Sequence, residues 1–331
     1  MEEKIIHCPI CETPTDAKAF LQTYISPYNN QEYKMYECSN CQLQWWEPLK
    51  MIPKFYEKEV FESYISYHEG LRKLPSWCEP FFKYFPKNKK GKLLDVGCGD
   101  GIFLNHAKEQ GFEVWGIDFD KKSIEAIKRN FHIERVFPMS LEEFYEYAKS
   151  KNLNFDVITF FEVLEHQDNP RKFLDIVKSL LNEKGWIVGS VPNRERLFAE
   201  IDWKYFHGDY PPHHFLRFSK LTLEKIFKLN NFSHIEVYCL DLSLLDAIPY
   251  IEKRLFGNLD TMKVGLKTKI TKDERKSRAY KVEDLENLKK SGVRLLKVLK
   301  FIRNLVLSPF VLLYIKKLKE NGPNLYFQVQ K

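Results

Sequence analysis

The chain has no apolar run of the roughly 20 residues that a bilayer-spanning helix requires. Its apolar stretch at residues 305–315 is too short for that purpose. No apolar segment follows the opening Met-Glu-Glu-Lys, so we expect no secretory signal peptide and a cytoplasmic protein. Hydrophobic residues make up 44% of the 331 positions and charged residues 29%, which is typical of globular proteins. A chain of this length is expected to fold into two or three units.

The net charge of +7 is unevenly distributed along the chain. Residues 251–331 contain 20 Lys and Arg against 8 Asp and Glu, a local net charge of +12. The other 250 residues carry 32 basic and 37 acidic side chains, a net charge of −5. This asymmetry indicates contact with an anionic surface, either phospholipid or nucleic acid.

Four of the seven cysteines form two close pairs with the spacing C-x-x-C, Cys8 with Cys11 and Cys38 with Cys41. Two such pairs supply the four thiolates of a tetrahedral zinc site, which is structural because no ligand position stays open for water. Two disulfides or a redox motif are the alternatives. A cytoplasmic chain disfavours disulfides, and a redox motif does not require a second pair. We therefore predict bound Zn²⁺ in an N-terminal zinc ribbon at residues 1–50.

A short apolar run at residues 93–96 leads directly into glycines at alternate positions, Gly97, Gly99 and Gly101. A helical pattern follows, which predicts a strand, a tight turn and a helix start that a ligand can approach closely. An ordinary strand-to-helix turn is one alternative. A dinucleotide-binding fold is another, because Asp118 lies 21 residues after Gly97 and could bind a ribose. However, the spacing is G-x-G-x-G rather than G-x-G-x-x-G, and the acidic Asp95 stands just before it.

Together with a second acidic cluster at residues 156–165, this pattern resembles the class I S-adenosylmethionine-dependent methyltransferases. The resemblance implies an α/β fold with a doubly wound, Rossmann-like, mostly parallel sheet of seven strands. Apolar strands that alternate with helices of roughly 10 to 15 residues fit such a sheet. Residues 324–330 would form the seventh strand, antiparallel to its neighbour. Strands two to six are expected within 114–118, 134–142, 155–166, 187–193 and 234–240.

The resemblance also assigns residues to S-adenosylmethionine. The Asp118 carboxylate would accept the ribose hydroxyls, and the Phe119 ring would cover the adenine. Backbone groups of the segment after the third strand would border the adenine, and the segment after the fourth strand would lie beside the methionine end. The complete predicted cofactor set is Asp95, Gly97, Cys98, Gly99, Gly101, Asp118, Phe119, Ser140, Leu141, Phe161, Glu162 and His166.

The cysteine pairs are followed by an aromatic-rich stretch at residues 51–90, which we predict to be connector helices. This arrangement resembles the zinc-containing sugar C-methyltransferases, in which an N-terminal zinc module and an aromatic connector precede the catalytic domain. Most rings of the connector would serve packing. Tyr64 and Tyr67 are candidates for the wall of an acceptor pocket.

In the zinc-containing sugar methyltransferases, a His-x-x-x-(Phe/Tyr)-Ser pattern after the fifth strand carries the general base. Residues 214–219 match it, with Ser219 as the expected N-cap of a helix at 221–228. Methyl transfer to oxygen or carbon requires removal of the acceptor proton, which suits a histidine with its usual pKa of ~6.5. We predict His214 as the base and His213 as its positioning partner. The doubled histidine and the preceding Pro-Pro depart from the pattern and leave the acceptor open.

Residues 241–322 lie between the sixth and seventh predicted strands and form a basic insertion, with a polar stretch at 263–290. Residues 293–317 follow with apolar positions at helical spacing, and Pro309 should kink or split that helix. The insertion either packs as a helical cap or contacts an anionic membrane through 293–317. Nucleic acid is not the expected partner, because only Tyr280 adds a ring among the basic residues of 263–297.

The sequence thus predicts a methyltransferase core at 91–240 plus 323–331. Its substrate would be a small or lipid-linked saccharide or similar hydroxylated metabolite, and the protein would be cytoplasmic, with peripheral contact at the inner membrane face. One alternative is an RNA methyltransferase that grips RNA through the zinc ribbon, although the chain lacks an Asn-Pro-Pro-aromatic motif. The other is a non-catalytic S-adenosylmethionine-binding protein, against which the intact segment 95–101 argues.

Overall fold

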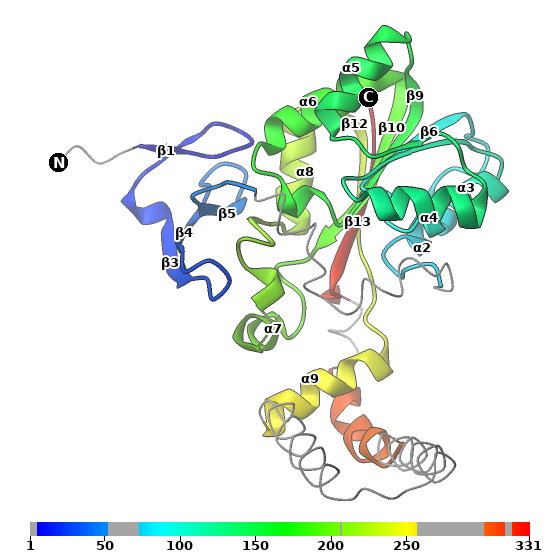
Figure 1. Ribbon diagram of the computed structural model, residues 1–331. Helices are drawn as coiled ribbons and strands as arrows, with labels where there is room; N and C mark the ends of the chain where they lie inside the picture. Colours follow the sequence, from blue (N-terminus) through cyan, green and yellow to red (C-terminus); the bar gives the residue numbers. More distant parts are fainter. Residues whose placement is uncertain (1–4, 52–72, 206, 257–300, 315–319) are drawn as a thin grey trace, which may run out of the picture. The chain divides into compact units, whose positions relative to one another are not determined.

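A computed structural model describes residues 5–51, 73–205, 207–256, 301–314 and 320–331 (Figure 1). The chain divides into two units. Unit 1 comprises Met1–Arg196, Gly208–Leu240 and Pro323–Lys331, and unit 2 comprises Leu197–His207 and Asp241–Gly322. Tyr64 and Tyr67 of the predicted connector and the polar stretch 263–290 lie outside the described residues.

Seven strands of unit 1 form one sheet in the order β12-β13-β10-β9-β6-β7-β8. Neighbouring strands from β10 to β8 are parallel, whereas β13 is antiparallel to both β10 and β12. This confirms the predicted Rossmann-like sheet with its antiparallel last strand. The bounds are β6 Lys92–Val96, β7 Glu113–Ile117, β8 Val136–Phe137, β9 Phe155–Phe161, β10 Leu181–Pro192, β12 Ser233–Cys239 and β13 Asn324–Gln330.

Helices cover both faces of this sheet (Figure 1). Leu94 and Ile158 belong to a core that contains residues of α5 (Leu141–Ser150), α6 (Pro170–Leu180) and α8 (Lys220–Leu229). Their neighbours Leu93 and Val157 belong to a second core with residues of α2 (Glu79–Tyr84), α3 (Ile102–Glu109) and α4 (Lys121–Phe131). Successive strand residues point to opposite faces, so a strand with helices on both sides has to be apolar at almost every position.

The turns after β6, β7 and β8 are set by residues that start helices. Gly101 caps α3 with a φ of 76°, and a Cβ there would lie 2.5 Å from a side-chain atom of Ile127. Asp120 caps α4 through hydrogen bonds from two backbone N–H groups, and Ser140 forms a capping box with Glu143 at α5. These local caps end the turns close to the sheet and leave the carboxyl ends of the strands accessible at one edge.

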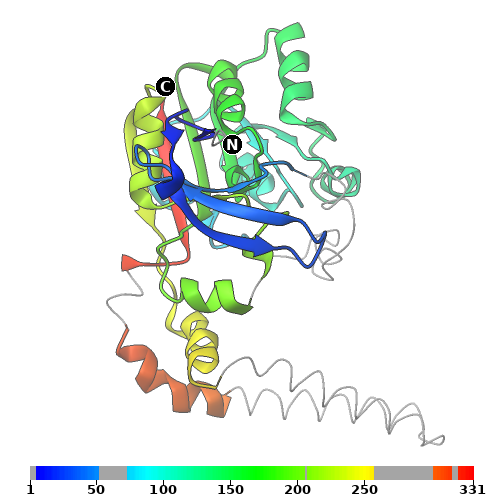
Figure 2. The same cartoon turned by 90° about the vertical axis from the view of Figure 1, so that its left-hand side faces the viewer.

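The N-terminal module consists of the short pair β1 (Ile6–His7) and β2 (Pro14–Thr15) and a four-stranded antiparallel sheet. This sheet has the order β11-β5-β4-β3, with β3 Phe20–Ile25, β4 Glu32–Glu37, β5 Gln44–Glu47 and β11 Leu216–Arg217. Figure 2 shows the β3–β4 hairpin in blue. The fourth strand of this sheet, β11, comes from the loop that holds the predicted catalytic histidines. The N-terminal module and that loop therefore share one sheet.

Unit 2 has a small helical core of its own. Its described helices are α7 (Ala199–Tyr205), α9 (Leu244–Phe256) and a helix at residues 301–312. The sequence predicts a kink or a split at Pro309, and the last helix continues through this proline, so it is not split there. Proline removes the N–H that would bond to the carbonyl of Leu305, but the hydroxyl of Ser308 donates to that carbonyl at 3.1 Å instead. No helix within the described ranges is both long and apolar enough to span a bilayer.

Candidate functional site

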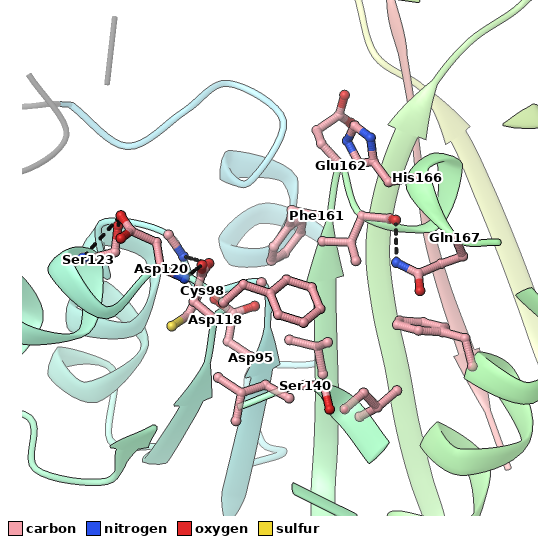
Figure 3. Close-up of a pocket in the computed structure, with 18 of the residues that line it drawn as sticks. Asp95, Cys98, Asp118, Asp120, Ser123, Ser140, Phe161, Glu162, His166 and Gln167 are labelled. Carbon is pink, nitrogen blue, oxygen red and sulfur yellow. Dashed lines mark hydrogen bonds between the residues drawn. The ribbon is translucent and has the colours of Figure 1, made fainter. Parts of the chain in front are cut away.

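A cavity of about 340 Å³ lies at the carboxyl ends of β6, β7 and β9 in unit 1 (Figure 3). Eleven of the twelve predicted cofactor residues line it. Gly101 is not among its lining residues, since it caps α3 instead. Ligands in open α/β sheets bind at this edge, so the structure brings the predicted cofactor residues to the expected place.

Asp118 stands at the end of β7 with both carboxylate oxygens held by the backbone. The N–H of Gly99 donates to Oδ2 and the N–H of Asp120 donates to Oδ1, each at 2.9 Å. Burial raises the pKa of Asp118, while these N–H groups oppose the rise. Each oxygen keeps a second lone pair. Asp118 is therefore a fixed acceptor in the cavity wall, suited to hydroxyl groups of a ligand (Figure 3).

Asp95, at position four of β6, is 3% exposed and accepts a 2.7 Å hydrogen bond from the hydroxyl of Thr159. Burial raises its pKa to about 8, and the nearby charges of Asp118 and Asp100 act in the same direction. The Asp95 carboxyl group is therefore protonated at neutral pH in the ligand-free protein, and a cationic ligand would favour its ionisation.

The lining of the cavity is strongly acidic. Among the described residues that line it, none is Lys or Arg. A dinucleotide brings an anionic pyrophosphate, which this lining disfavours, whereas a ligand that carries positive charge suits it. The carboxyl groups belong to Asp95, Asp100, Asp118, Asp120, Glu142, Glu162 and Asp168.

Two glutamates stand where β9 ends. Glu162 has a φ of 55°, and its carboxylate accepts from the Ser190 hydroxyl at 2.8 Å and from the Asn324 amide at 3.0 Å. Glu165 is 1% exposed, and neither carboxylate oxygen has a hydrogen-bond partner within the described residues. Burial raises the pKa of Glu165 well above its usual value, and its Oε1 lies 3.8 Å from Nε2 of His166. The sequence prediction included Glu162 but missed Glu165.

Three histidines meet at this end of the cavity. Each of His166, His213 and His214 offers one ring nitrogen, and these three nitrogens lie within 4.8 Å of one another. His166 Nδ1 donates to the backbone carbonyl of His213 at 2.6 Å. His166 and His213 line the cavity, and the His214 ring centroid lies 4.7 Å from both of their centroids. Burial, aided by the His214 charge, lowers the pKa of His213 to about 3 and that of His166 well below its usual value.

His214 is oriented by Asp209, which the sequence prediction missed. Nδ1 of His214 donates to Asp209 Oδ1 at 2.9 Å, and the guanidinium of Arg196 donates to Oδ2 at 2.9 Å. Burial opposes ionisation of Asp209, but these two partners outweigh it and hold its pKa well below the usual range. The one signal in the sequence was the position of Asp209 in the same loop, five residues before His214.

The four N-terminal cysteines converge on one point. Their Sγ atoms are 3.6 Å apart for Cys8 and Cys41, 3.4 Å for Cys11 and Cys38, and 3.6 Å for Cys11 and Cys41. A tetrahedral zinc site with Zn–S bonds of ~2.3 Å requires about 3.8 Å between sulfurs, so the cluster fits this ion. All four cysteines are free of disulfides.

The two cysteine pairs have the same local geometry. The N–H of Glu12, directly after the first pair, donates to the carbonyl of Cys8, and the N–H of Gln42, directly after the second pair, donates to the carbonyl of Cys38. Both donor residues have a positive φ, 57° at Glu12 and 62° at Gln42. Two matching knuckles that face one another are a donor set for one metal ion.

Comparison with known proteins gives a family match and several relatives. Residues 67–237 match a family described as a methyltransferase domain. A ubiquinone biosynthesis O-methyltransferase of Bordetella avium is 30% identical over 145 residues, which cover 40% of this chain and 58% of that protein. The protein of the same name from Paraburkholderia phymatum is 27% identical, over 57% of this chain and 78% of that protein. The chain thus spans less than two thirds of the Bordetella relative.

Among solved structures, the Haemonchus contortus Phospholethanolamine N-methyltransferase 2 has a TM-score of 0.50 at 15% identity. The match covers 87% of this chain and 62% of that protein. At this identity the likeness concerns the fold alone, and it agrees with the seven-stranded sheet described above.

Replacing Asp95 by asparagine should flatten the dependence of stability on pH. Unfolded Asp titrates near 3.9, whereas the folded pKa is about 8, so between these values only the folded state holds the proton. The free energy of unfolding of the wild type should therefore fall as the pH rises from 5 to 8. Denaturant titrations of the ligand-free proteins should show a smaller fall for Asp95→Asn, with the exposed Asp175→Asn behaving as wild type. An equal fall in all three proteins would contradict the buried, protonated Asp95.

Proposed function

The chain belongs to the methyltransferase family whose domain its residues 67–237 match, and on this basis we propose that it transfers a methyl group from S-adenosylmethionine to a hydroxylated acceptor. The acceptor is a small or lipid-linked saccharide or a similar hydroxylated metabolite. The observation that carries the proposal is the acidic cavity at the ends of β6, β7 and β9, with Asp118 fixed in its wall. The names of the relatives, O-methyltransferases, support a hydroxyl group as the acceptor.

The residues of the cavity fit S-adenosylmethionine by their chemistry. Asp118 offers free lone pairs to ribose hydroxyls, and Phe119, which is 52% exposed at the cavity, offers a ring face to adenine. The acidic lining, Glu162 included, balances the positive charges of the sulfonium and amino groups. When bound, this cofactor supplies an electrophilic methyl group.

Binding of the demethylated cofactor, S-adenosylhomocysteine, tests this site. Asp118→Ala removes two charge-assisted hydrogen bonds to the ribose and should weaken binding by about 10- to 100-fold in titration calorimetry. Asp175→Ala, which removes an exposed carboxylate of α6 outside the cavity, is the matched control and should bind as wild type. Tighter binding of NAD than of S-adenosylhomocysteine would refute the proposal.

For proton removal we assign His214 as the general base. Its Nδ1–H donates to Asp209, which leaves Nε2 as the basic nitrogen. The ionised Asp209 fixes the ring orientation and stabilises the imidazolium that forms when Nε2 takes the acceptor proton. The lowered pKa of His213, about 3, makes its ring a weak base, so His213, which lines the cavity, positions the acceptor or His214 instead of taking the proton.

His214→Ala should lower turnover by about 10²- to 10⁴-fold, because a positioned base contributes that much to the rate. Affinity for S-adenosylhomocysteine should stay within about twofold of wild type, since His214 is not among the residues that line the cavity. Turnover is measured as transfer of labelled methyl groups to the lipid, soluble and RNA fractions of the host. The matched control is replacement of the exposed His234 of β12 by alanine, which should leave turnover as in wild type. A His214→Ala variant that keeps more than about a third of turnover rules out this base.

The same labelling experiment separates the candidate acceptors. Label in a saccharide, free or lipid-linked, supports the substrate that the N-terminal cysteine module suggests. Label on a ring hydroxyl supports an acceptor like the one that the names of the relatives indicate. Label in RNA would refute the metabolite proposal and favour an RNA methyltransferase.

We further propose that Cys8, Cys11, Cys38 and Cys41 bind one structural Zn²⁺. The support is the set of Sγ distances of 3.4–3.6 Å and the matching knuckle geometry. Four thiolates close the coordination shell, so the ion takes no part in the chemistry. Its role is to hold β4 and β5, to which β11 of the histidine loop is added.

Metal analysis of protein purified without chelator should find one zinc per chain. Cys8→Ser and Cys41→Ser should lose the metal and lower the midpoint of thermal unfolding, because metal-binding energy here is folding energy. Cys239→Ser, outside the cluster, should keep one zinc per chain. A metal-free wild type with four titratable thiols and unchanged thermal stability would refute the site.

A further inference from the structure

One half of the helix at residues 301–312 and the turn after it is apolar and exposed. The exposed fractions reach 69% at Phe301, 65% at Leu305 and 80% at Leu313. At 3.6 residues per turn, the exposed apolar side chains fall on one half of the helix circumference, with no charged residue among them. We call this surface the apolar face, and it consists of Phe301, Ile302, Leu305, Val306, Phe310, Leu312 and Leu313.

The other half of the same helix already has a partner within unit 2. Leu307 is 3% exposed and Val311 is 1% exposed, and both belong to a core with Ala247 and Ile251 of α9. Arg303 forms an ion pair with Glu252 at 3.0 Å on that side. The helix is thus anchored by one face, and among the described residues its second apolar face is exposed. A continuous exposed apolar surface of this kind marks an interaction site.

The charge of the surrounding sequence indicates which partner covers the apolar face. Residues 293–319 contain seven Lys and Arg and no Asp or Glu, and the last 81 residues carry a net charge of +12. An apolar helix face flanked by basic residues in the sequence is the composition of helices that lie in the interface of an anionic bilayer. We propose that the apolar face inserts into the headgroup region of an anionic lipid bilayer and docks the protein there peripherally.

The topology connects this surface to the cavity. Unit 2 leaves unit 1 after Leu240, at the end of β12, and returns at Pro323, next to the start of β13. Asn324, the first residue of β13, donates to the Glu162 carboxylate in the cavity wall. Because the two units are joined by these chain segments, membrane docking through unit 2 would keep unit 1 tethered to the membrane. This inference rests on the proposed function in one respect: it favours a lipid-linked acceptor over a freely diffusing one.

Vesicle flotation with the full-length chain tests the proposal. The protein should float with vesicles of phosphatidylcholine and phosphatidylglycerol at low salt, but not with vesicles of phosphatidylcholine alone. Binding should weaken as salt is raised, because screening shortens the reach of the basic charges. Leu305→Asp and Leu313→Asp should each weaken binding by about tenfold or more, since each loses the burial of one leucine. Leu229→Asp, at an exposed leucine that ends α8 in unit 1, should float as wild type.

Three results would overturn the inference: wild-type protein that stays unbound at low salt, Asp variants that float as well as wild type, or a dimer in light scattering that Leu305→Asp dissociates. The last result would show that a second copy covers the apolar face. Binding of S-adenosylhomocysteine and the helical content in circular dichroism should both be unchanged in the Asp variants, which excludes misfolding of unit 1 and of unit 2. Flotation requires no catalysis, so its failure is distinguishable from failure of the proposed function, which the calorimetric test decides separately.

Discussion

The arrangement of the site depends on one buried carboxylate, that of Asp209. Its two oxygens accept from Arg196, which follows β10, and from His214, which precedes β11. Its backbone carbonyl accepts from the guanidinium of Arg217 in β11 at 3.2 Å. Removing one partner of a buried charge typically costs about 3–5 kcal/mol, because the remaining charge is left uncompensated. The histidine loop therefore cannot move away from β10 without that penalty, and the ring of His214 is held in one orientation.

The N-terminal module takes part in the same arrangement. Leu216 of β11 pairs with Trp45 of β5, and the N–H of Trp46 donates to the carbonyl of Phe215 at 3.0 Å. The guanidinium of Arg217 lies 5.5 Å from the ring centroid of Trp46 and 4.9 Å from that of Tyr210. A buried cation close to two aromatic rings adds attraction to the pairing of the strands. The cysteine module thus forms one wall of the histidine loop, and its effect on catalysis would be positional.

The parts that sequence reasoning predicted are those with local signals. The strands show apolar runs, the turn after β6 shows alternate glycines, and Ser219 precedes α8 as its N-cap. The parts it missed depend on contacts between distant segments. Nothing local to Asp209 identifies Arg196 as its partner, and nothing near Glu162 points to Asn324, 162 residues away. The prediction of a kink or a split at Pro309 was local too, and the split does not occur, since a neighbouring hydroxyl replaces the lost backbone donor.

The acidic and basic residues are separated along the chain, and each group suits a ligand of opposite charge. The cavity of unit 1 presents carboxyl groups without Lys or Arg among its described lining residues, whereas the basic residues concentrate after position 250. At physiological ionic strength the Debye length is about 8 Å, so each group of charges acts mainly on ligands or surfaces close to it. A cationic small molecule and an anionic surface can then be attracted by the same chain without competing for one site. An acidic core and a basic insertion can therefore serve different ligands in one protein, although their opposite charges partly cancel in the net charge of +7.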